Sequence, residues 1–95
     1  MKWAEVIMVR SAGNNSETLD LALETLMDEV EIETGDRTIR VFRHEKLSSD
    51  ICIVLFHNQK KTKAGGSILG LHLVAALKEI GLVNHTIWHD QYDTT

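Results

Sequence analysis

Two short stretches of this sequence are apolar at nearly every position, "AEVIMVR" (residues 4–10) and "ICIVLFH" (residues 51–57). Successive side chains of a β-strand point to opposite faces of the sheet. Both faces of each stretch are apolar under this alternation: Val6 and Met8 oppose Ile7 and Val9, and Ile51, Ile53 and Leu55 oppose Cys52, Val54 and Phe56. The two stretches therefore predict central strands of a sheet that is covered on both sides.

Two further segments carry apolar residues at helical spacing, and each begins at a serine suited to an N-cap. They are Ser16 with Leu19, Leu23, Leu26 and Val30, and Ser67 with Ile68, Leu69, Leu73, Ala76, Leu77 and Ile80. The first helix is expected to end between Glu29 and Thr34. The second is expected to end before Gly81, which stands where a C′ glycine terminates a helix.

The remaining segments predict two edge strands. "RTIRVFRHE" (37–45) alternates polar and apolar residues and forms a hairpin with 51–57, and "LVNHTIWHD" (82–90) closes the chain. The resulting order, β-α-β-β-α-β, predicts a single α+β domain over residues 1–95 with a ferredoxin-like fold. Its sheet is expected to be antiparallel, in the order 4-1-3-2, with both helices on one face.

The second face of this sheet needs a cover of its own, because two helices protect only one side. A second copy of the chain is the simplest candidate. We therefore expect a homodimer in which the two sheets pack face to face.

The segment "GGSILGLHLVAALKEIGLVNHTIWHD" (65–90) resembles the end of dimeric α/β-barrel proteins, a superfamily that includes antibiotic-biosynthesis-monooxygenase-like and stress-responsive barrel domains. The resemblance implies two ferredoxin-like subunits packed sheet to sheet. It also implies one of two functions. The first is a cofactor-independent oxygenase acting on a small aromatic substrate between the sheets. The second is a non-catalytic domain for ligand binding or assembly.

Face parity selects the candidate site residues. If Val83 and Ile87 meet the helices, the opposite face of the sheet carries the predicted ligand-binding residues, Arg40, Phe42, Thr86 and Trp88. In an oxygenase-like enzyme, His44 or His85 would transfer the proton. Haem-degrading relatives pair an asparagine on the first strand with tryptophan and histidine, and this first strand has no asparagine. The alternative for Trp88 is simple packing in a dimer interface.

The stretch "KKTKAGGS" (60–67) precedes the second helix and offers two interpretations. A weak anion site would use Lys63 with Gly65, Gly66 and Ser67 at the helix N-terminus. The alternative is a solvated loop followed by a serine cap. The lysines precede the glycines, so the stretch is not a P-loop. Residues 58–66 are expected to be the most mobile internal segment.

No metal or cofactor is expected. His85 and His89 lie on one predicted strand, roughly 13 Å apart at 3.3 Å per residue. Two ligands that each lie about 2 Å from one zinc ion cannot be so distant. Cys52, the single cysteine, is mid-strand and predicts a small buried side chain rather than a reactive thiolate.

Charge and composition limit the partners. The net charge is −4, which argues against nucleic-acid binding. The sequence has neither a signal-peptide pattern nor an apolar stretch long enough to span a membrane. We therefore expect a cytoplasmic protein whose partners are a second copy and a small-molecule ligand.

Overall fold

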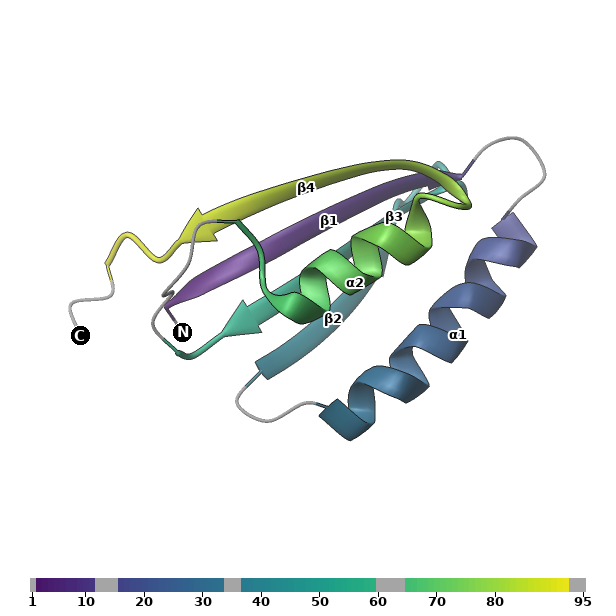
Figure 1. Ribbon diagram of the computed structural model, residues 1–95. Helices are drawn as coiled ribbons and strands as arrows, with labels where there is room; N and C mark the ends of the chain where they lie inside the picture. The colour runs from purple at the N-terminus through teal and green to yellow at the C-terminus, as the bar shows by residue number, and fades with distance from the viewer. Residues whose placement is uncertain (1, 12–15, 34–36, 60–64, 93–95) are drawn as a thin grey trace.

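A computed structural model describes residues 2–11, 16–33, 37–59 and 65–92 (Figure 1). Its elements follow the predicted β-α-β-β-α-β order. They are β1 (Trp3–Ser11), α1 (Ser16–Glu33), β2 (Arg37–Arg43), β3 (Asp50–His57), α2 (Ile68–Leu77) and β4 (Gly81–His89). Among the described residues, no helix is long and apolar enough to cross a membrane.

The four strands form one antiparallel sheet in the order β2-β3-β1-β4. Read from β4, this is the order expected from the sequence. The two strands that are apolar on both faces, β1 and β3, are central, and β2 and β4 are the edges. The architecture is α+β and compatible with a ferredoxin-like fold.

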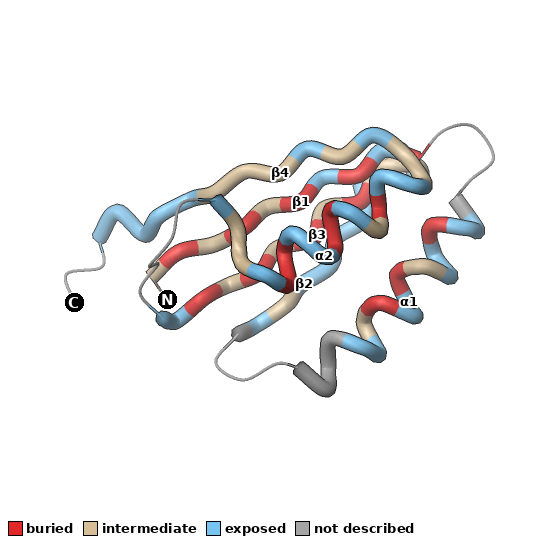
Figure 2. The backbone as a smooth tube through the Cα atoms, in the orientation of Figure 1, coloured by how far each residue is buried: buried red, intermediate tan, exposed pale blue. Residues whose placement is uncertain are grey.

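Both helices cover the same face of the sheet, as their shared hydrophobic core shows. Figure 2 shows buried residues along β1 and β3 and on both helices. The core combines alternate strand residues with the inward stripes of the helices: Ile7, Val9, Ile51, Ile53 and Leu55, with Leu19, Leu23, Leu26, Leu69, Leu73, Val74 and Leu77. Each such side chain contributes roughly 1.5–3 kcal/mol through burial, so this one layer of contacts fixes α1 and α2 on the sheet.

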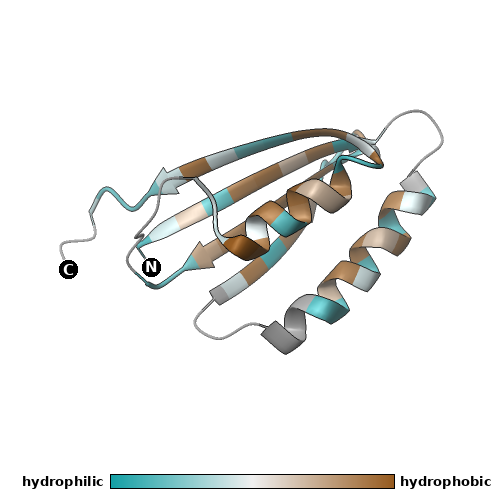
Figure 3. Cartoon of the chain, in the orientation of Figure 1, coloured by the Kyte–Doolittle hydropathy of each residue, from teal (hydrophilic) through white to brown (hydrophobic). Residues whose placement is uncertain are grey.

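The opposite side of the sheet, which we call the helix-free face, carries the other alternate residues. These are Ala4, Val6, Met8 and Arg10 of β1, Thr38, Arg40 and Phe42 of β2, Asp50, Cys52, Val54 and Phe56 of β3, and Leu82, Asn84, Thr86 and Trp88 of β4. Four of its large apolar side chains, Met8, Phe42, Leu82 and Trp88, are exposed. Figure 3 shows apolar residues along the central strands as well as along α2.

The first strand of the β2–β3 hairpin is shorter than the predicted strand, 37–45. Strand β2 ends at Arg43, and Phe42 pairs with Cys52. His44 lies in the turn, where its Nδ1 accepts hydrogen bonds from the N–H groups of Lys46 and Leu47, each at 3.0 Å. The side chain thus stabilises the turn.

The end of α2 differs from the prediction. The helix ends at Leu77, and Lys78 is its C-cap, with its N–H bonded to the carbonyl groups of Val74 and Ala76. Gly81 is not a C′ glycine, since it opens β4 without a positive φ. Instead it allows close approach of two strands, because a Cβ there would lie 2.2 Å from the carbonyl oxygen of Arg10.

We expect Gly81→Ala to destabilise the fold by about 1–3 kcal/mol, the usual cost of overpacking, because its new methyl group meets backbone that cannot swing away. Urea unfolding at a fixed protein concentration measures the change. Leu71→Ala, at an exposed position on the outer surface of α2, serves as the control and should shift the midpoint much less. Equal midpoints for wild type and Gly81→Ala would contradict this role for the glycine.

Candidate functional site

Among the described residues, one carboxylate is fully buried between the sheet and the helices. Glu5 is in the middle of β1, on the same face as Trp3, Ile7 and Val9, and its exposed fraction is 0%. Removing a carboxylate from water costs several kcal/mol unless hydrogen bonds replace the lost water. The structure must therefore supply donors at this position.

Three elements supply those donors. The Nε2 of His57, at the end of β3, lies 2.7 Å from Oε1 of Glu5, and the Nε2 of His85 in β4 lies 2.8 Å from Oε2. The N–H of Ser67, just before α2, donates to Oε1 at 3.0 Å. An ionised carboxylate only accepts hydrogen bonds, so both imidazoles carry a proton on Nε2. We call Glu5, His57, Ser67 and His85 the carboxylate cluster.

The N-terminus of α2 is part of this cluster. Ser67 caps the helix through its hydroxyl oxygen, which accepts the N–H of Gly70 at 2.9 Å. Helix N-termini attract negative charge, and here the chain provides that charge as Glu5. Of the residues predicted to bind an external anion, Ser67 has its N–H engaged by Glu5, and Lys63 lies outside the described residues.

The glycines of the "GGSILG" segment make room for the carboxylate. A Cβ on Gly66 would lie 2.5 Å from Oε2 of Glu5 and 2.4 Å from Cε1 of His85, and one on Gly70 would lie 1.9 Å from Oε2. Gly65 has a φ of 83°, which only glycine adopts readily. Gly65 thus serves the turn, whereas Gly66 and Gly70 serve the close approach of Glu5. Most of the segment predicted to be mobile, 60–64, lies outside the described residues.

The hydrogen bonds keep Glu5 ionised despite its burial. Burial raises the pKa of Glu5, but hydrogen bonds from the Ser67 side chain and N–H, from His85 and from His57 together lower it by more. Its pKa therefore lies below the ordinary value of 4.5.

The two histidines differ in their surroundings. The His57 ring stacks on Trp3, with centroids 4.0 Å apart and an interplanar angle of 20°, and is almost wholly buried. The His85 side chain is 17% exposed. Its Nε2 is engaged by Glu5, so Nδ1 is the ring nitrogen left to exchange a proton with solvent or a ligand. His85, predicted as a proton-transfer residue, thus meets solvent on the helix-covered side of the sheet.

The other predicted site residues lie elsewhere. Thr86 and Trp88 are neighbours on the helix-free face, where Nε1 of Trp88 donates to Oγ1 of Thr86 at 2.8 Å. Phe42 and Arg40 occupy the same face but lie on β2, at the far edge of the sheet. Three strand spacings of about 4.8 Å separate the two edges. One chain therefore does not gather all four residues into one site, and His44 and His85 occupy separate regions.

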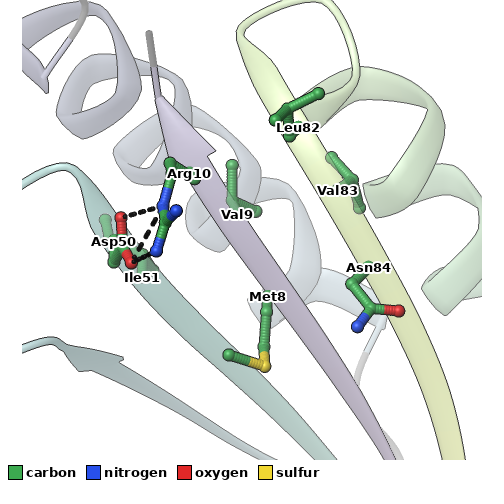
Figure 4. A pocket seen from close by; sticks show the side chains of 8 residues that line it. All are labelled: Met8, Val9, Arg10, Asp50, Ile51, Leu82, Val83 and Asn84. Carbon is green, nitrogen blue, oxygen red and sulfur yellow. Dashed lines mark hydrogen bonds and ion pairs between the residues drawn. The ribbon is translucent and has the colours of Figure 1, made fainter.

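A pocket of about 310 Å³ opens at one end of the sheet (Figure 4). Five of its lining residues lie on the helix-free face: Met8, Arg10, Asp50, Leu82 and Asn84. The other three, Val9, Ile51 and Val83, alternate with them along the strands. Arg10 binds both carboxylate oxygens of Asp50 through Nε and Nη2, at 2.9–3.2 Å. The hydrogen bond from Arg10 holds the pKa of Asp50 below its usual range.

Sequence reasoning missed Glu5 and His57 as a buried pair, and it missed Arg10, Asp50 and Asn84 as pocket residues. One signal for Glu5 was present, a lone charge at an inward position of an apolar strand. Among the described residues, no three His, Cys, Asp or Glu side chains form a group suited to a metal ion. In the carboxylate cluster, the histidine Nε2 atoms are directed at the carboxylate itself.

Comparison with known proteins adds no identification. No protein-family model matches the sequence, and no curated protein is significantly similar to it. The functional argument therefore depends on the geometry of this chain.

The depressed pKa of Glu5 predicts an acid-sensitive contribution to stability. The contribution is fully present above pH 4.5, the ordinary pKa, and is lost as the pH falls through the lower pKa of the folded state. We expect Glu5→Gln to be less stable at pH 7 by about 1.5–3 kcal/mol, the value of hydrogen bonds to a charged group. The difference in unfolding free energy between the wild type and Glu5→Gln should narrow as the pH falls toward 3. Urea unfolding at each pH measures this difference.

Glu79→Gln is the matched control, because Glu79 is exposed and outside the cluster. Its stability should follow that of the wild type across the same range. A Glu5→Gln deficit that is the same at pH 7 and pH 3 would contradict the ionised state of Glu5 in the fold.

Proposed function

We propose that this chain acts as a homodimer in which the helix-free faces of two sheets pack together and enclose a small-molecule binding site. The observation that carries the proposal is the apolar character of that face. Both central strands present apolar side chains there, and Met8, Phe42, Leu82 and Trp88 are exposed in the single chain. Contiguous apolar surfaces of this kind mark interaction sites.

The size of the face agrees with a dimer interface. Four strands at about 4.8 Å spacing and about 8 residues at 3.3 Å give a face of roughly 500 Å². Two copies would then bury roughly 1,000 Å² or more, near the lower limit for a specific interface.

The distribution of polar groups also supports a partner with the same surface. The middle of the face is apolar, with Val6 and Val54 paired at its centre. Arginine lies toward its margins, Arg40 on edge strand β2 and Arg10 near the end of β1. An apolar centre with a polar rim is the usual anatomy of a protein interface.

Binding is better supported than catalysis at this face. An oxygenase-like reaction needs a group that transfers a proton beside the substrate. The Nδ1 of His44 is occupied by two turn N–H groups, and His85 lies on the opposite side of the sheet. The oxygenase hypothesis therefore rests on the sequence resemblance alone, whereas the binding and assembly function rests on the exposed apolar face.

The proposal predicts that a charge on the helix-free face disrupts the dimer. We expect the wild-type chain to sediment as a dimer at micromolar concentration and Met8→Glu to sediment as a monomer, because the carboxylate would be buried without a partner. Analytical ultracentrifugation measures both, and circular dichroism checks that the variant is folded.

Leu71→Glu is a closely matched control. Leu71 is on the outer surface of α2 and is 53% exposed, compared with 52% for Met8. It should leave the dimer intact. A monomeric wild type, or a dimer that Leu71→Glu disrupts and Met8→Glu does not, would overturn the proposed interface.

A further inference from the structure

The pocket at the Arg10 end of the helix-free face contains hydrogen-bonding groups that the fold leaves unused. Arg10 binds Asp50 through Nε and Nη2, so the Nη1 donors have no partner among the described residues. The Asn84 side chain likewise makes no hydrogen bond within the described chain. Both side chains border the same pocket (Figure 4).

In a single chain these groups are satisfied by water. A second sheet packed on this face would remove much of that water, and unpaired buried donors cost free energy. Because stacked sheets lie about 10 Å apart, a pocket between them can hold a ligand in place of that water. This step depends on the proposed dimer, which would form the roof of the pocket.

The apolar part of the pocket comes from Met8 and Leu82. Both are exposed, and they project from neighbouring strands on either side of the pocket floor. Methionine adapts its shape and contacts aromatic rings favourably. A volume of about 310 Å³ is at the lower end of the range of small-molecule pockets, which suits a ligand with a single ring.

The charge of the pocket decides between an anionic and a neutral ligand. Arg10 and Asp50 are direct partners in the β1–β3 register, and their charges cancel. A carboxylate on the ligand would be attracted by Arg10 and repelled by Asp50. A neutral carbonyl oxygen needs only the donors, which Arg10 Nη1 and the Asn84 amide provide.

We propose that this pocket binds a small neutral molecule with a carbonyl oxygen on an aromatic ring. The carbonyl accepts hydrogen bonds from Arg10 and Asn84, and the ring lies against Met8 and Leu82. The site is separate from the residues selected by face parity, Arg40, Phe42, Thr86 and Trp88.

Three probes of similar size test this ligand class. Acetophenone has a neutral carbonyl group, benzoate has an anionic carboxylate, and ethylbenzene has neither group. Titration of the ¹⁵N-labelled full chain, followed by ¹H–¹⁵N NMR, should show saturable shifts at Met8, Arg10, Leu82 and Asn84 with acetophenone. Ethylbenzene should bind about 3- to 10-fold more weakly, because it lacks the carbonyl acceptor. Benzoate should also bind more weakly than acetophenone, because Asp50 repels its carboxylate.

Two cation-to-methionine variants make the comparison. Arg10→Met should weaken acetophenone binding part of the way toward that of ethylbenzene, because Asn84 still donates, whereas Lys78→Met, at an exposed position at the end of α2, should leave the binding unchanged. Asn84→Leu provides a second variant if Arg10→Met fails to fold. Tightest binding of benzoate, equal effects of Arg10→Met and Lys78→Met, or no saturable shift at the pocket would overturn the proposal.

Sedimentation of the same samples separates the two proposals. A dimer that does not bind acetophenone overturns the ligand assignment and leaves the assembly intact. A monomer that binds acetophenone in the expected order supports the pocket and overturns the dimer.

Discussion

The ionised carboxylate of Glu5 is the interaction on which the arrangement of this fold depends. It is buried among apolar side chains and accepts hydrogen bonds from β3, β4 and the start of α2. Breaking a buried charge network by removing one partner commonly costs about 3–5 kcal/mol. Three strands and a helix terminus must therefore come together correctly for Glu5 to be tolerated at all, and this requirement excludes other packings of α2.

The two faces of the sheet meet different demands. On the helix-covered face, the helices of the same chain bury the apolar residues, and hydrogen bonds within the chain pair the Glu5 carboxylate. On the helix-free face, the apolar centre and the unused donors of Arg10 and Asn84 stay in contact with water. Because β1 and β3 are apolar on both sides, the single chain completes only half of the burial that its central strands offer.

Local sequence patterns were enough for the element order, the central strands and the face on which each edge-strand residue lies, because these follow from a period of two residues. The carboxylate cluster needed more. His57, Ser67 and His85 are 52, 62 and 80 residues from Glu5, so their meeting depends on strand register. Gly81 was assigned to a helix end because its role, close contact with the Arg10 backbone, is visible only once β1 and β4 are paired.

The buried cluster also determines what the helix-free face presents. His85 bonds to Glu5 and therefore points toward the helices, so its neighbours Asn84 and Thr86 must point the other way. A shift of β4 by one residue would turn every side chain of β4 to the opposite face and remove the His85 donor from Oε2 of Glu5. The free-energy cost of leaving this buried carboxylate oxygen without His85 thus favours the observed register of β4. In doing so it places Asn84 in the pocket, although no atom of the cluster lies on the pocket's side of the sheet.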